Sequence, residues 1–152
     1  MARYVARVRT PMPPREAFAY MSDLTNFAEW DPGVSRVEQV TGQGAGPDAA
    51  FDVVVALPLG SMTLRYETTA YDGDDTTMTA FAENLLLTSE DTITVDADGD
   101  GSIVVYDAEL KLKGPLGLSD PLLGLTFDRI GDRAAAGLVD ALAGERVPAS
   151  GS

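Results

Sequence analysis

The spacing of hydrophobic residues in the last part of the chain predicts one long α-helix. From Leu118 to Ala143, apolar side chains recur every three or four positions, as they do along one face of a helix: Leu123, Phe127, Ile130, Ala134, Leu138 and Ala141. Asp120 followed by Pro121 is typical of a helix start, because a carboxylate can cap the first turn and proline lacks the N–H that would stay unpaired there. A helix of roughly 25 residues is about 37 Å long, so the rest of the chain must cover its apolar face.

Most of the preceding chain predicts β-strands. Residues 2–10 alternate apolar residues with arginines, which indicates a half-buried strand. Six further strand candidates are separated by Gly, Pro and Asp clusters of hairpin length: Val34–Thr41, Ala50–Leu57, Met62–Tyr71, Thr76–Glu83, Thr88–Val95 and Ser102–Lys113. Residues 15–22 and 24–30 predict two short helices. These elements predict an α+β fold in which a seven-stranded, curved antiparallel sheet surrounds the long C-terminal helix, with two short helices after the first strand.

The expected domain organisation is a single domain over residues 1–146 and a disordered tail over residues 147–152. In an up-and-down sheet, three apolar connections fall at the same end, at residues 58–61, 84–87 and 114–117. Converging apolar loops suggest the mouth of a cavity or a contact surface. Alternatively, their leucines fold inward and close the end of the sheet.

Composition excludes several kinds of function. The chain of 152 residues has no cysteine and no histidine, which removes disulfides, Cys-His and Ser-His-Asp nucleophile systems and the usual zinc sites. Its net charge of −13 disfavours nucleic acids and anionic membranes as partners. No stretch approaches the roughly 20 apolar residues of a membrane span. We expect a soluble, cytoplasmic, acidic protein, a monomer or homodimer, with no stable membrane insertion.

An aspartate-rich segment offers two interpretations. Residues 96–101 read D-A-D-G-D-G, the opening of an EF-hand loop, and Asp107 stands where the closing carboxylate belongs. The flanking residues are β-branched and alternating, whereas EF-hand loops lie between helices. The sequence therefore favours a hairpin turn over a calcium site, and it predicts no metal and no cofactor.

The predicted C-terminal helix contains glycines at positions where a helix would favour other residues. Gly124, Gly131 and Gly137 each cost about 1 kcal/mol relative to alanine. The helix approaches the sheet closely at these positions, or the glycines leave room for a ligand, or both hold at different depths.

One carboxylate is predicted on the apolar face of the sheet. Pairing the last hairpin across its turn places Asp91 opposite Tyr106, on the face that points inward with Val104 and Ala108. A carboxylate in an apolar interior must be paired, hydrogen-bonded or neutralised by a raised pKa. Tyr66 lies on the corresponding face of an earlier strand and is the third member of this candidate cluster. Alternatively, Asp91 only accepts a hydrogen bond from Tyr106 and fixes the strand register.

Particular stretches resemble a known family. The segments PPREAFAYMSDLTNFAEWDPGV, DTITVDADGDGSIVVYDAELKLKG and DPLLGLTFDRIGDRAAAGL resemble the opening, the closing strands and the last helix of polyketide cyclase/dehydrase-like proteins of the START/Bet v 1-like (SRPBCC) superfamily. The resemblance implies a helix-grip fold with a cavity between the sheet and the C-terminal helix. Trp30, Asp31 and Pro32 match W-D-P positions that we interpret as structural. The superfamily includes aromatase/cyclases, plant ligand carriers and lipid-transfer domains.

The resemblance and the candidate cluster together give a functional hypothesis. We expect a cavity that binds a hydrophobic or aromatic, polyketide- or lipid-like small molecule, lined by Leu64, Tyr66, Asp91, Tyr106, Gly124, Phe127 and Ile130. Cyclases of the superfamily commonly use arginine, tyrosine, histidine or serine of the cavity. In this chain the candidate catalytic residues are Asp91 as acid or base, and Tyr106 or Tyr66 as the group that polarises an enol oxygen during aldol cyclisation or dehydration. The alternatives are a carrier or sensor without chemistry, and a structural domain whose interior is full.

Overall fold

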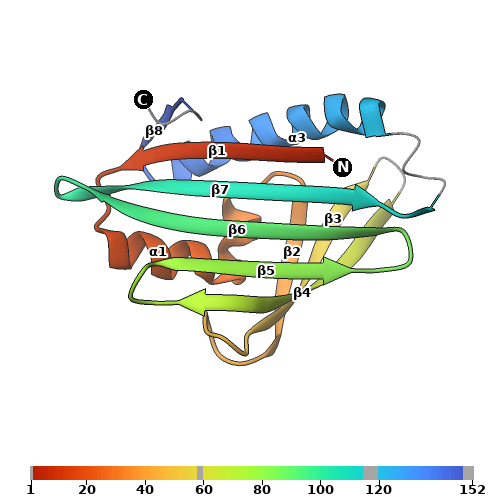
Figure 1. Ribbon diagram of the computed structural model, residues 1–152, viewed down its shortest axis with the longest axis horizontal. Helices are drawn as coiled ribbons and strands as arrows, with labels where there is room; N and C mark the ends of the chain where they lie inside the picture. Colours follow the sequence, from red (N-terminus) through yellow and green to blue (C-terminus); the bar gives the residue numbers. More distant parts are fainter. Residues whose placement is uncertain (1, 58–59, 115–119, 149–152) are drawn as a thin grey trace.

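The computed structural model describes residues 2–57, 60–114 and 120–148, and the side chains of residue 57 and residues 120–126 are outside this description. Figure 1 shows the helices and strands, which are β1 (Ala2–Thr10), α1 (Pro14–Ser22), the 3-10 helix η1 (Leu24–Asn26), α2 (Phe27–Trp30), β2 (Val34–Thr41), β3 (Ala50–Leu57), β4 (Gly60–Asp72), β5 (Thr77–Glu83), β6 (Leu87–Asp98), β7 (Gly101–Leu112), α3 (Asp120–Ala141) and β8 (Glu145–Val147). The predicted α+β helix-grip architecture is confirmed.

All the strands join one antiparallel sheet. Over the described residues it has eight strands in the order β2-β3-β4-β5-β6-β7-β1-β8. The eighth strand is absent from the sequence prediction, because three residues are too few to show a period of two. Val147, a residue of the predicted tail, pairs with Arg7 of β1 in this strand. Residues 149–152 of the predicted tail lie outside the described residues.

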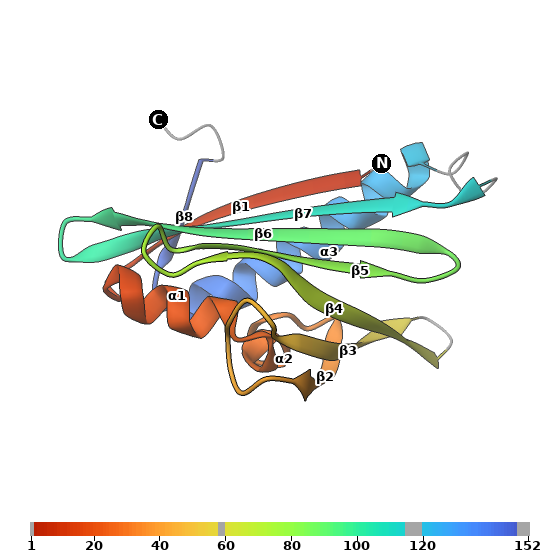
Figure 2. The ribbon, with the colours of Figure 1, turned by 60° about the horizontal axis from the view of Figure 1, so that its bottom comes forward.

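The sheet is strongly curved, and the helices occupy its concave side. Figure 2 shows β4 bending away from the layer formed by β5, β6, β7 and β1, so that β3 and β2 turn beneath the helices. Helix α1 packs against β6 and β7, α3 packs along β1, and α2 lies between α3 and β2. The core between the layers contains fully buried side chains from both, among them Phe51, Met78 and Ile93 from the sheet and Met21 and Leu138 from the helices.

The register of the β6–β7 hairpin differs from the predicted one. Asp91 pairs with Ala108 and Ile93 pairs with Tyr106, so β7 is shifted by two residues. The cause is a tighter turn: Asp98 pairs with Gly101, and Gly99, with a φ of 59°, occupies the two-residue connection. A shift of two preserves the face on which each side chain lies, so Asp91 still points inward. The hairpin interpretation of residues 96–101 is confirmed.

Two glycines of α3 allow close packing. A Cβ at residue 131 would overlap the ring of Tyr4, and a Cβ at residue 137 would overlap the carbonyl oxygen of Trp30. At both positions the reason for glycine is therefore the approach of the helix to its neighbours. Gly124 is part of α3, but its surroundings lie outside the described residues.

The apolar stripe of α3 follows the predicted positions only in part: the Leu123 side chain lies outside the described residues, and Phe127 is half-buried. Ala134 and Leu138 are buried, whereas Ala141 is exposed and Leu142 is buried in its place. Leu142 follows Leu138 by four residues, a spacing that keeps both side chains on the same helix face. Ile130 is 46% exposed.

Candidate functional site

An internal cavity of about 300 Å³ lies between the sheet and α3. Its walls are mostly apolar: Phe27, Gly33, Val34, Val53, Val55, Met62, Leu64, Leu87, Ala108, Leu110, Leu112, Phe127 and Ile130. Its polar lining residues are Asp31, Tyr66, Ser89, Asp91 and Tyr106. Six of the seven predicted ligand-binding residues therefore line one cavity. The seventh is Gly124, whose surroundings lie outside the described part of the structure.

Asp91 and Tyr106 form a buried hydrogen-bonded pair. The Tyr106 hydroxyl donates to Oδ2 of Asp91 at 2.8 Å. The two residues are diagonal neighbours on adjacent strands, and Asp91 itself stands between Ala80 and Ala108, whose small side chains leave room beside it. Burial raises the pKa of Asp91 to about 7, although the hydrogen bond from Tyr106 favours its ionised form.

Tyr66 belongs to a second pair, which the sequence prediction did not include. Its hydroxyl lies 2.6 Å from Oγ of Ser89. The two residues come from β4 and β6, and Ala82 of β5 pairs with both of them, so a small side chain separates the two hydroxyl-bearing residues. Burial, followed by the nearby charge of Asp91, raises the pKa of Tyr66 well above its ordinary value. Tyr66 therefore stays a neutral hydroxyl.

Asp31 is a cavity residue that the sequence interpretation treated as structural only. It follows α2 directly, and its Oδ1 accepts a hydrogen bond from the backbone N–H of Gly33 at 2.8 Å. Burial raises its pKa. The structural part of the interpretation is right, because this hydrogen bond shapes the turn into β2. The carboxyl group nevertheless also lines the cavity.

Aromatic rings fix the end of the cavity nearest α2. Trp30 stacks on Phe27 with ring centroids 4.7 Å apart, and its ring meets Tyr106 edge-on at 5.2 Å. Such contacts restrict the rotation of each ring. They hold the Tyr106 hydroxyl where Asp91 can accept from it.

The β5–β6 turn is the one of the three predicted apolar connections whose residues are all described, and it carries exposed leucines. In the β5–β6 turn, Leu85 is 94% exposed and Leu86 is 51% exposed, and the carbonyl of Leu86 accepts from the N–H of Lys113 at 2.8 Å. The neighbouring Leu87 and Leu112 line the cavity. Residues 58–59 and 115–117 of the other two predicted loops are outside the described residues. In this turn two leucines project into solvent and do not close the end of the sheet.

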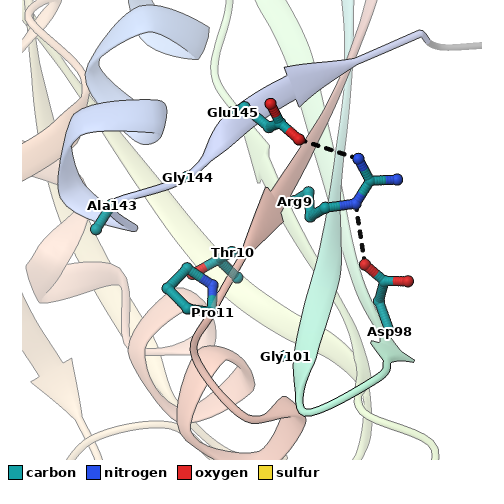
Figure 3. Close-up of a pocket in the computed structure, with 8 residues that line it drawn as sticks. All are labelled: Arg9, Thr10, Pro11, Asp98, Gly101, Ala143, Gly144 and Glu145. Carbon is teal, nitrogen blue, oxygen red and sulfur yellow. Dashed lines mark hydrogen bonds and ion pairs between the residues drawn. The ribbon is translucent and has the colours of Figure 1, made fainter.

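A second depression, of about 470 Å³, is an open surface groove at the opposite end of β7. Figure 3 shows Arg9 in the groove, between Asp98 and Glu145. Its Nε lies 2.9 Å from Asp98, and its Nη1 lies 3.0 Å from Glu145. Both carboxylates already engage this guanidinium, and the groove is open to solvent. It is therefore less suited to a hydrophobic ligand than the cavity between the sheet and α3. Among the described residues, no group of three or more acidic side chains is placed to hold a metal ion.

The cavity residues can perform two kinds of chemistry. A carboxyl whose pKa is near 7 can give or accept a proton at neutral pH. The tyrosine and serine hydroxyls can donate hydrogen bonds to the oxygens of a bound molecule. The apolar walls can bind a hydrophobic skeleton and exclude water from it.

Comparison with known proteins identifies the family. The model of the family described as polyketide cyclase / dehydrase and lipid transport matches residues 1–143. A search of the curated proteins finds no match. In the described part of the chain, no helix has both the length and the apolar character needed to cross a membrane.

Solved structures share the fold. The protein TTHA0849 from Thermus thermophilus is 19% identical, with 99% of each chain covered and a TM-score of 0.76. A START superfamily protein from Mycobacterium smegmatis is 13% identical, with 94% of this chain and 98% of the other covered and a TM-score of 0.72. The Zhui aromatase/cyclase from Streptomyces sp. R1128 is 9% identical, with 92% and 90% covered and a TM-score of 0.72. At these identities the likeness is one of fold.

Proposed function

The chain belongs to the polyketide cyclase/dehydrase and lipid transport family of the START/Bet v 1-like superfamily, and from this premise we propose that it binds a hydrophobic or aromatic, polyketide- or lipid-like small molecule in the cavity between the sheet and α3. The observation that carries the proposal is the cavity of about 300 Å³, which combines apolar walls with a few buried polar groups. Small-molecule sites in proteins commonly have this composition.

Native mass spectrometry of the purified full chain tests the proposal. We expect a co-purifying small molecule, or saturable binding of the neutral hydrophobic dye N-phenylnaphthylamine with increased fluorescence. Ala108→Phe fills the cavity with a larger side chain, because Ala108 is buried in its lining. It should weaken dye binding by about tenfold or more.

A matched control keeps that experiment specific. Ala70→Phe makes the same change at an exposed position of β4 and should leave binding unchanged. Circular dichroism should show that both variants fold. Equal dye affinity in the two variants, or the absence of any retained molecule and any dye binding in the native chain, would reject binding in this cavity.

The acid–base properties of Asp91 favour a second step beyond binding. In an aldol dehydration, the Asp91 carboxylate would take the proton α to a carbonyl, the C–OH bond would break, and the departing hydroxyl would leave as water with that proton. The Tyr66 hydroxyl would polarise the enol oxygen, or the Tyr106 hydroxyl would do so after turning its single proton away from Asp91, to which it donates in the structure. The apolar cavity would hold a folded chain in a reactive shape.

The enzymatic and carrier functions give different results with an added poly-β-ketone mimic. A catalyst converts the mimic, and Asp91→Asn abolishes the conversion while binding and folding remain. A carrier or sensor retains the mimic intact, and the same variant then changes nothing but affinity. Equal turnover by the wild type and the variant would exclude the role of Asp91.

A further inference from the structure

The charged side chains that face the cavity have the same sign. Among the described lining residues, those that can carry a full charge at neutral pH are Asp31 and Asp91. They are 8% and 3% exposed, and they come from different elements: Asp31 follows α2, and Asp91 lies in β6. We call this pair the acidic pair.

No basic side chain among the described lining residues compensates the acidic pair. Several arginines are instead committed to carboxylates on the outer surface. Arg65 binds Asp52 at 2.8 Å, Arg3 binds Asp107 at 2.6 Å, and Arg9 lies between two carboxylates in the groove of Figure 3. The potential inside the cavity is therefore set by carboxyl groups, in a chain whose net charge is already −13.

Each carboxyl group of the acidic pair has one oxygen that accepts no hydrogen bond from the described residues. Among the described residues, Oδ1 of Asp31 accepts from the Gly33 N–H, and Oδ2 of Asp91 accepts from the Tyr106 hydroxyl. Oδ2 of Asp31 and Oδ1 of Asp91 have no such partner. An ionised carboxylate only accepts hydrogen bonds, and an ammonium group only donates them.

We propose that the acidic pair makes this cavity select hydrophobic molecules that carry a protonated amine, and reject those that carry a carboxylate, sulfonate or phosphate. The inference rests on the proposed binding function and names the class of ligand for that same site. Ions of either sign lose hydration on entering an apolar cavity. The interaction with Asp31 and Asp91 therefore decides between them, since it favours a cation and opposes an anion.

A matched series of ligands tests the proposal. Decylamine, decanol and decanoate share one alkyl chain and differ in charge, and each can displace N-phenylnaphthylamine from the full chain at about pH 8. We expect decylamine to bind at least about tenfold more tightly than decanol, and decanoate at least about tenfold more weakly. Anilinonaphthalenesulfonate, which adds a sulfonate to the skeleton of the neutral dye, should bind correspondingly more weakly than that dye.

Variants of the acidic pair should remove the discrimination. Asp31→Asn and Asp91→Asn keep the shape and an oxygen that can accept the existing hydrogen bonds, and the double variant should bring the three alkyl ligands within about threefold of one another. Asp52→Asn and Glu90→Gln remove one negative charge each at positions on the outer face of the sheet, where Asp52 pairs with Arg65 and Glu90 is exposed. These controls should keep the wild-type ranking.

The wild-type pH dependence provides a readout that needs no variant. Asp91 faces Tyr106 of β7, Tyr66 of β4 and the Asp31 carboxyl, and the two tyrosines stay neutral because burial raises their pKa values. As pH rises through about 7, Asp91 loses its proton, so the affinity for decylamine should rise and that for decanoate should fall.

The outcomes separate this inference from the proposed function. If the neutral dye and decanol bind but decanoate binds as tightly as decylamine, selection by charge is wrong and binding in the cavity stands. If the ranking is as expected but persists in the double variant, the acidic pair is not its cause and the inference is overturned. If neither the dye nor any alkyl ligand binds, both the function and the inference fail.

Discussion

The raised pKa of Asp91 predicts a measurable loss of stability with increasing pH, which Asp91→Asn should remove. The carboxyl has a pKa of about 7 in the folded chain, against 3.8 for the unperturbed group. The folded state thus holds this proton more tightly than the unfolded state. The favourable contribution is fully present below about pH 4 and falls as pH rises toward 7, beyond which it changes little.

The size of the effect follows from the same two values. A difference of roughly 3 units at about 1.36 kcal/mol per unit amounts to about 4 kcal/mol over the whole range. Somewhat less than half of this is already lost at about pH 5, because the unfolded group is mostly ionised there. Between about pH 5 and pH 8, the free energy of unfolding of the wild type should therefore fall by about 2 to 3 kcal/mol relative to Asp91→Asn.

Urea unfolding followed by tryptophan fluorescence can measure this difference. Trp30 is the one tryptophan of the chain, and its ring lies against Tyr106, the hydrogen-bond donor to Asp91. Glu90→Gln is the control, because it removes a carboxylate from the neighbouring, exposed position of β6. The same pH dependence in both variants, relative to the wild type, would refute a raised pKa of Asp91 in the folded chain.

Two further predictions concern the packing of α3 and the acidity of Asp91. Gly137→Ala should lower the free energy of unfolding by about 1–3 kcal/mol in the same urea assay, because the added Cβ overlaps the Trp30 carbonyl oxygen; unchanged stability would show that α3 and the end of α2 separate without cost. Tyr106→Phe should raise the pKa of Asp91 above about 7 in an NMR titration of its carboxyl carbon, because the lost hydroxyl stabilised the carboxylate. Tyr66→Phe, whose hydroxyl contacts Ser89, should shift that pKa less.

The sequence predicts which cavity residues point inward better than it predicts their strand-pairing and hydrogen-bond partners. A period of two assigns Asp91 and Tyr106 to the concave face even though the predicted register was wrong by two residues. Ser89 could have been included on the same ground, since it precedes Asp91 by two residues in β6. Its contact with Tyr66 could not be predicted, because β5 separates the two strands and only the curvature of the sheet and the small Ala82 bring the hydroxyls together.

Asp31 illustrates a different limit of sequence reasoning. It follows the short helix α2 and precedes Pro32, where no periodicity indicates which way a side chain points. The local motif explains its hydrogen bond to Gly33 equally well with or without a cavity behind it. Only the packing of α2 against α3 and β2 turns this carboxyl toward the same space as Asp91.

The packing of α3 explains why the cavity lies beside one part of the helix and not along all of it. Gly131 and Gly137 bring the helix against Tyr4 and the Trp30 carbonyl, and Leu138 fills the space beyond them with a fully buried side chain. Phe127 and Ile130, which precede these positions, line the cavity instead. Substitutions at the glycines should therefore act on stability, whereas substitutions at Phe127 or Ile130 should act on ligand binding. A helix held closely at one end can leave a cavity at the other without losing its place in the fold.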